Sequence, residues 1–99
     1  MDDEELAISI TKGFLDDLPG RIDELKGYLG AKDVAGVKHV THSIKGAAAN
    51  LGGNALSAVA ADMEKKAKSG KFEAVTDSLP ELEKQFFRLK EEMGKHFQY

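Results

Sequence analysis

Residues 6–29, LAISITKGFLDDLPGRIDELKGYL, decide the fold class of this chain. Their large apolar side chains recur every three or four residues, which places them on one face of an amphipathic helix: Leu6, Ile10, Phe14, Leu18, Ile22, Leu25 and Leu29. Pro19 interrupts the run. Because proline removes a backbone donor and crowds the preceding turn, we expect a kink, or a split into two collinear helices near Leu18.

Three further segments show helical spacing. Gly30 can end the first helix and Asp33 can cap a second one over residues 34–50. Asn54 can cap a third segment, which ends near Gly70 and carries Leu56, Val59, Ala60, Met63 and Ala67 on one side. The last segment carries Val75, Leu79, Leu82, Phe86, Leu89, Met93 and Phe97, and Pro80 should bend it or mark its first turn.

Short connections between amphipathic helices favour antiparallel neighbours. We therefore predict an all-α fold, an antiparallel up-and-down four-helix bundle with an additional N-terminal helical segment. A chain of 99 residues has room for one hydrophobic core, so residues 1–99 are predicted to form a single domain.

The composition is that of a globular chain, with 41% hydrophobic and 31% charged residues. No cysteine is present, so the chain cannot form disulfides and does not depend on an oxidising compartment. The acidic residues 2–5 and the lack of a long apolar run argue against a signal peptide and a membrane span. With a net charge of -3 and both signs interspersed, a phosphate-neutralising surface for nucleic acid is not evident from the totals. We expect a cytoplasmic protein whose partners are proteins, with neither nucleic acid nor membrane among them.

The second helical segment carries the most informative pattern. A helix advances about 100° per residue, so each side chain can be placed around the axis. The apolar side chains then lie opposite His42: Val37, Val40, Ile44, Ala47, Ala48 and Leu51. His42 is therefore predicted to point into solvent, on a face that it shares with Lys38, His39, Lys45, Gly46 and Ala49.

Gly46 is unusual on this face, because an exposed glycine inside a helix costs about 1 kcal/mol relative to alanine. Together with Ala49 it leaves a shallow clearing through which another protein could reach the imidazole of His42. An imidazole is mostly neutral near pH 7 and can then act as a nucleophile. A phosphoryl group carries up to about two negative charges, and the ammonium of Lys45 beside the clearing could hold it by charge-assisted hydrogen bonds. His42 therefore has the properties that a phosphoryl acceptor needs.

Residues 42–52, HSIKGAAANLG, resemble the phosphoacceptor motif of histidine-containing phosphotransfer domains. The resemblance covers roughly residues 5–90, with support from FLDDLP at residues 14–19 and from a downstream pattern of Leu56, Ala60, Met63, Glu64, Ala67 and Gly70. It implies a four-helix bundle in which His42 is phosphorylated on Nε2 and exchanges the phosphoryl group with an aspartate of a receiver domain. Lys45 and Gly46 would take the family's supporting and clearance roles.

Glu64 is a candidate partner of the histidine. The string HSIKG also resembles the phosphotransfer domain of chemotaxis kinases, in which a glutamate on the next helix contacts the histidine, and Glu64 stands at that position. Spacing gives independent support, since His42 lies ten residues before Gly52 and Glu64 twelve after it, at similar heights on an antiparallel hairpin. A carboxylate that accepts from Nδ1–H would fix the tautomer that leaves Nε2 free.

Two alternatives concern pairs of residues. His39 and His42 lie one helical turn apart and could bind a metal with an acidic third ligand, but no tight cluster of carboxylates and histidines completes the shell, so we expect no metal site. Ile8 and Leu15 lie toward one edge of the N-terminal stripe, and they could belong either to the core or to a patch that docks a partner.

The implied partners are a response-regulator receiver domain and a cognate histidine kinase, with the chain itself a monomer. No cofactor is expected on this chain, because the magnesium ion belongs to the acidic site of the receiver. The chain also lacks a nucleotide-binding glycine loop, so we predict a phosphorylated carrier and not an enzyme. Two alternatives stay open: a helical interaction module without phosphoryl chemistry, and a phosphotransfer domain that is part of a larger sensor or chemotaxis kinase.

Overall fold

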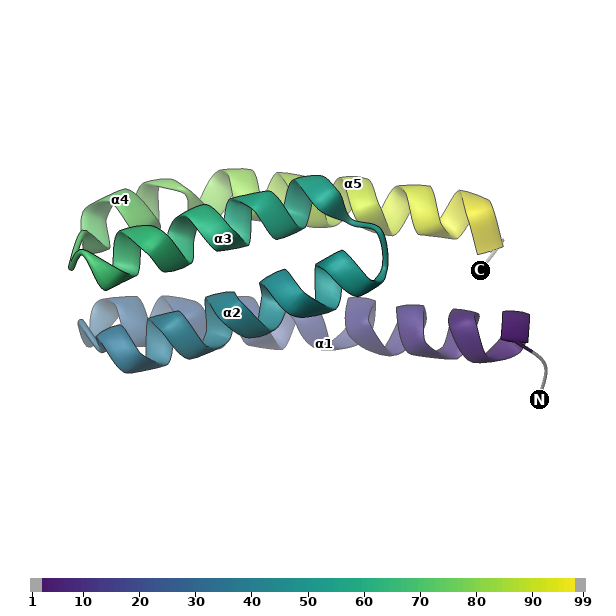
Figure 1. Cartoon of the computed structure of the whole chain (residues 1–99), viewed down its shortest axis with the longest axis horizontal. Helices are drawn as coiled ribbons and strands as arrows, with labels where there is room; N and C mark the ends of the chain where they lie inside the picture. Colours follow the sequence, from purple (N-terminus) through teal and green to yellow (C-terminus); the bar gives the residue numbers. More distant parts are fainter. Residues whose placement is uncertain (1–2, 98–99) are drawn as a thin grey trace.

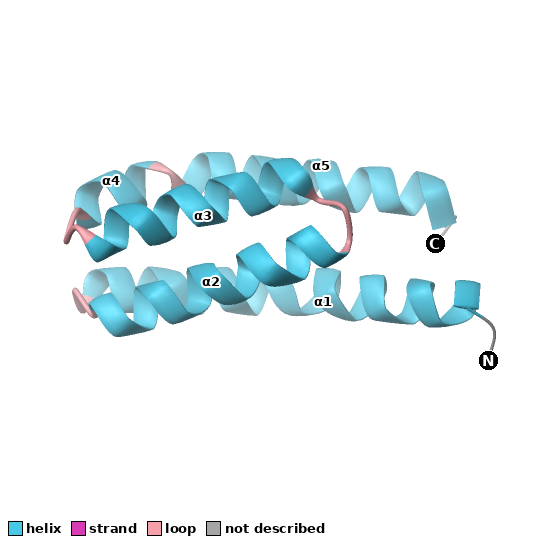
Figure 2. Cartoon of the chain, in the orientation of Figure 1, coloured by secondary structure: helices cyan, strands magenta, loops and turns pink. Residues whose placement is uncertain are grey.

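A computed structural model describes residues 3–97, with side chains for residues 5, 6 and 9–95. These residues form helices α1 (Asp3–Gly30), α2 (Val34–Asn50), α3 (Asn54–Lys68), α4 (Phe72–Asp77) and α5 (Leu79–Phe97). Residues 3–97 contain no strand. The four long helices run alternately up and down along one axis, and short turns connect them (Figures 1 and 2). The predicted all-α four-helix bundle is confirmed.

The N-terminal segment is part of a single continuous helix. α1 is 28 residues long and contains Pro19, so the expected split near Leu18 does not occur. Pro19 is exposed, and its ring therefore costs a backbone hydrogen bond without disturbing the core. The additional N-terminal helical segment is thus an extension of the first bundle helix.

This extension changes the burial expected for the start of the stripe. α2 is only 17 residues long, and the N-terminal end of α1 projects beyond the turn between α2 and α3 (Figure 1). Leu6 and Ile10 are consequently 49% and 56% exposed, so the apolar stripe does not pack in the core at its N-terminal end. Leu15 is 4% exposed and belongs to the core.

The last predicted segment divides at Ser78 into the short helix α4 and the long helix α5. The hydroxyl of Ser78 donates to the carbonyl of Ala74 (3.0 Å) and accepts from the ammonium of Lys66 (3.2 Å). Pro80 lies in the first turn of α5, one of the two expected positions, where its missing N–H leaves no helical bond unmade.

The core runs the length of the hairpin and draws on all the helices. Its largest fully buried side chains include Leu18 and Leu25 of α1, Ile44 of α2, Met63 of α3 and Leu82 of α5. Burial of such side chains is the main contribution to the stability of a small bundle, at about 25 cal/mol per Å² of apolar surface. Because one face of α2 is committed to this core, the opposite face is left for the site.

The turn between α2 and α3 fixes the register of the hairpin. Gly52 adopts a φ of 76°, in the left-handed region that favours glycine, and the N–H of Gly53 donates to the carbonyl of Ala48 (2.8 Å). At the other end of α2, Asp33 caps the helix as predicted by accepting from the N–H of Gly36 (3.0 Å). The predicted cap at Asn54 is wrong, since Gly53 holds the cap position of α3 without a side-chain bond.

Candidate functional site

The site is built on the face of α2 that points away from the core. Val37, Val40, Thr41, Ile44 and Ala48 are buried, and the opposite face exposes His39, His42, Gly46 and Ala49. The side chain of His42 is 67% exposed. The structure therefore places the imidazole where a macromolecular partner can reach it.

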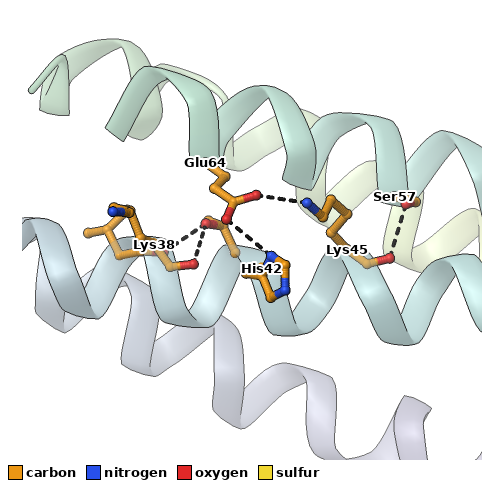
Figure 3. A network of polar contacts seen from close by, with 7 residues as sticks. Lys38, His42, Lys45, Ser57 and Glu64 are labelled. Atoms are coloured by element: carbon orange, nitrogen blue, oxygen red, sulfur yellow. Dashed lines mark hydrogen bonds and ion pairs between the residues drawn. The ribbon is translucent and has the colours of Figure 1, made fainter. Parts of the chain in front are cut away.

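Glu64 of α3 contacts both polar residues of this site. One carboxylate oxygen, Oε2, lies 3.2 Å from Nδ1 of His42, and the other, Oε1, accepts from Nζ of Lys45 at 2.9 Å (Figure 3). The Glu64 side chain is only 12% exposed. A single, largely buried carboxylate thus holds the histidine and the lysine of α2 in a fixed relation.

Glu64 is charged near neutral pH in spite of its burial. Burial raises the pKa of the carboxyl, but the hydrogen bond and charge of Lys45, together with the charges of His42 and Lys68, outweigh this effect and lower the pKa below its ordinary value of 4.5. The site therefore holds a carboxylate and not a carboxylic acid.

The ionised carboxylate determines the tautomer of His42. A carboxylate can only accept hydrogen bonds, so in this contact Nδ1 carries the proton. The other ring nitrogen, Nε2, is then unprotonated in the neutral imidazole and is turned away from Glu64 (Figure 3). The geometry presents a lone pair toward the exposed side of the helix.

Two further hydrogen bonds hold α2 from both sides. The hydroxyl of Ser57 on α3 donates to the carbonyl of Lys45 (3.0 Å), and Nη1 of Arg21 on α1 donates to the hydroxyl of Ser43 (2.9 Å). We did not predict either contact. The hairpin register that pointed to Glu64 could have found Ser57, whereas nothing in the local sequence links Arg21 to Ser43.

The remaining residues of the face leave room around His42. A Cβ added to Gly46 would meet nothing within 4 Å beyond its own helix, and Ala49 is exposed. His39 is exposed and Lys38 is half-buried. Neither makes an ion pair with another residue for which the structure describes a side chain.

The two candidate docking residues lie away from this face or cannot be placed. Leu15 packs in the core, so the alternative that it docks a partner is ruled out. Ile8 belongs to α1, but its side chain lies outside the part of the chain that the structure describes.

Residues 3–97 contain no group of three or more His, Cys, Asp or Glu side chains placed to hold a metal ion, as far as these side chains are described. None of the described helices combines the length and apolarity that a membrane crossing requires.

The fold and the site together define a helical bundle that presents one exposed, carboxylate-held histidine. Comparison with protein families matches residues 10–93 to the Hpt domain, and the chain belongs to this family. Its role is therefore histidine phosphotransfer within a phosphorelay, and Hpt domains are carriers that interact with receiver domains and kinases. Comparisons with curated proteins and with solved structures gave no match.

Proposed function

We propose that His42 is the phosphoacceptor of this domain, receiving a phosphoryl group from an aspartate of a receiver domain or from a kinase and passing it to the aspartate of a response regulator. The observation that carries the proposal is the contact of Glu64 with Nδ1 at 3.2 Å on a histidine whose side chain is 67% exposed. That contact leaves Nε2 as an accessible nucleophile.

The transfer step does not require a proton to leave the imidazole ring. The lone pair of Nε2 attacks the phosphorus of the donor's aspartyl phosphate, the P–O bond breaks, and the donor's carboxylate leaves with that bond's electron pair. The new N–P bond makes the ring an imidazolium that keeps its proton on Nδ1. Glu64 stabilises this new positive charge through a charge-assisted hydrogen bond, which favours the phosphorylated state. Transfer to the next aspartate is the reverse step.

Lys45 and Gly46 support the exchange in different ways. The ammonium of Lys45 has three donors, so it can keep its bond to Glu64 and offer another donor to the phosphoryl oxygens. Gly46 keeps the approach to Nε2 open, and Ala49, one turn further along the helix, adds little bulk. Lys38 and His39 flank the same exposed face.

The proposal treats the domain as a monomer, because His42, Lys45 and Glu64 come from two helices of one chain. It needs no cofactor on this chain, since the magnesium ion is expected in the receiver. It also places the exchange in the cytoplasm, where a chain without cysteine has no need of an oxidising environment.

The test uses the two exposed histidines of α2 as a matched pair. The purified protein is incubated with a receiver domain that carries a radioactive aspartyl phosphate, and acid-labile, alkali-stable phosphate on the domain is measured. His39→Gln should accept phosphate like the wild type, and His42→Gln should accept none. Labelling of the His42→Gln protein would refute the proposal.

A further inference from the structure

Lysines line the seam between α2 and α3 beside His42. Lys38 and Lys45 lie seven residues apart and therefore on the same side of α2, the side on which Lys45 reaches Glu64 of α3. Across the seam, Lys68 lies one turn beyond Glu64 on α3, and its charge lowers the pKa of that carboxyl. Lys65 is exposed next to Glu64. Figure 3 shows Lys38 and Lys45 on opposite sides of His42 along the helix.

This positive charge is not balanced within the seam. Glu64 is shared by His42 and Lys45, and Lys38, Lys65 and Lys68 make no ion pair within the part of the chain whose side chains are described. Lys66 on the same helix shows the contrast, because it pairs with Asp62 at 2.7 Å. The whole chain carries a formal charge of -3, so a basic seam does not follow from composition.

Folding does not account for the cluster. Like charges on one face repel one another, and none of Lys38, Lys65 and Lys68 forms an ion pair among the described side chains that would offset this repulsion. Helix α1, which packs on the other side of α2, exposes Asp16, Asp17, Asp23 and Glu24 and places Arg21 against Ser43 of α2.

We propose that Lys38, Lys65 and Lys68 form a basic docking surface that steers the acidic active-site face of a receiver domain onto His42. The inference rests on the proposed function, in which the partner brings a phosphorylated aspartate and the carboxylates of its magnesium site. Opposite charge on the two approaching faces raises the rate of productive encounter, by about 10 to 1,000-fold in steered complexes.

The test compares two triple variants of equal net charge. The seam variant is Lys38→Gln, Lys65→Gln and Lys68→Gln. The control is Lys12→Gln, Lys84→Gln and Lys90→Gln, three exposed lysines on α1 and α5 that also make no ion pair among the described side chains. The donor is a receiver domain phosphorylated with acetyl phosphate, and the receiver that transfers fastest in a panel is used. Rapid-quench kinetics then gives the second-order rate constant for transfer. Ionic strength is varied from about 0.01 M to about 1 M, which shortens the Debye length from about 30 Å to about 3 Å.

The seam variant should transfer about tenfold more slowly than the wild type at low ionic strength, with the difference lost at high ionic strength, because screening removes the steering. The control should keep the wild-type salt dependence. Equal salt dependence of the wild type and the seam variant would overturn the docking surface and leave the phosphoacceptor role intact, as would a control variant slowed as much as the seam variant. A wild-type protein that accepts no phosphate from any receiver would overturn both proposals.

Discussion

Replacing Glu64 with Gln tests the part of the site on which the chemistry depends most. The substitution keeps the size and the hydrogen-bonding reach of the side chain but removes its charge. In the structure the carboxylate is 12% exposed, accepts from Lys45 at 2.9 Å and lies 3.2 Å from Nδ1 of His42. The glutamine can still accept from one of the two partners, so the change removes the charge and one of the two acceptors.

The expected cost to stability is modest and depends on pH. A hydrogen bond to a charged group contributes about 1.5 to 3 kcal/mol, and since the amide retains part of it, we expect Glu64→Gln to lose about 1 kcal/mol at pH 7. For a domain of this size that lowers the Tm by about 4 to 8 °C. Because folding lowers the pKa of Glu64 below 4.5, its contribution is present above that value and is lost as pH falls through the lower folded-state pKa. The Tm difference between variant and wild type should therefore shrink in acid.

Phosphoryl acceptance should slow by about tenfold, which corresponds to the loss of about 1.4 kcal/mol of stabilisation of the imidazolium. The assay combines single-turnover transfer from a phosphorylated receiver with nitrogen NMR of the His42 ring, which reports the tautomer directly. Asp62→Asn is the matched control, because it removes the same charge from the same helix at a side chain that is 55% exposed and pairs with Lys66. A Glu64→Gln protein with the wild-type tautomer and the wild-type rate would refute the positioning role of Glu64.

Further substitutions probe the helix that carries His42. Lys45→Ala should slow transfer several-fold and keep the fold. It should also raise the pKa of Glu64, because the charge and hydrogen bond of Lys45 no longer offset the effect of burial. The transfer rate and a carboxyl titration by NMR check these outcomes. Gly46→Ala should stabilise the domain by up to about 1 kcal/mol, as Gly27→Ala should, since neither added Cβ meets a neighbour within 4 Å. Gly46→Glu should stay folded yet lose transfer by at least about 100-fold through obstruction and like-charge repulsion, and a fully active Gly46→Glu protein would contradict the clearance role. Ile44→Ala should cost about 2 to 5 kcal/mol in urea unfolding, because the side chain is fully buried on the core face of the same helix.

The fold could be predicted where local pattern and tertiary packing agree. Helical spacing gave the four long helices, and Asp33 marked the start of α2 as expected. The errors arose where the length of a neighbouring helix decides whether a side chain is buried. Leu6 and Ile10 carry the right spacing but lie beyond the end of the hairpin, and no local pattern states how far a neighbouring helix extends.

The site could be predicted from residues that share one helix, because helical geometry fixes their relative directions. His42 and Gly46 lie on the exposed face for this reason. The contact with Glu64 required the register of two helices, which the glycine turn at residues 52–53 supplied through similar chain lengths on either side. The hydrogen bonds of Ser57 and Arg21 were not predicted, because the sequence does not indicate which partner a hydroxyl or a guanidinium at a helix surface will bond.

In the proposed mechanism, Glu64 holds the proton of His42 on Nδ1 and leaves Nε2 to accept the phosphoryl group. The most direct measurement is two-dimensional phosphorus and nitrogen NMR of the phosphorylated domain with nitrogen-15 in its histidines, which identifies the nitrogen bonded to phosphorus. We expect one phosphorylated nitrogen, Nε2 of His42, with the proton still on Nδ1. Phosphorus bonded to Nδ1 of His42, or to His39, would contradict this mechanism.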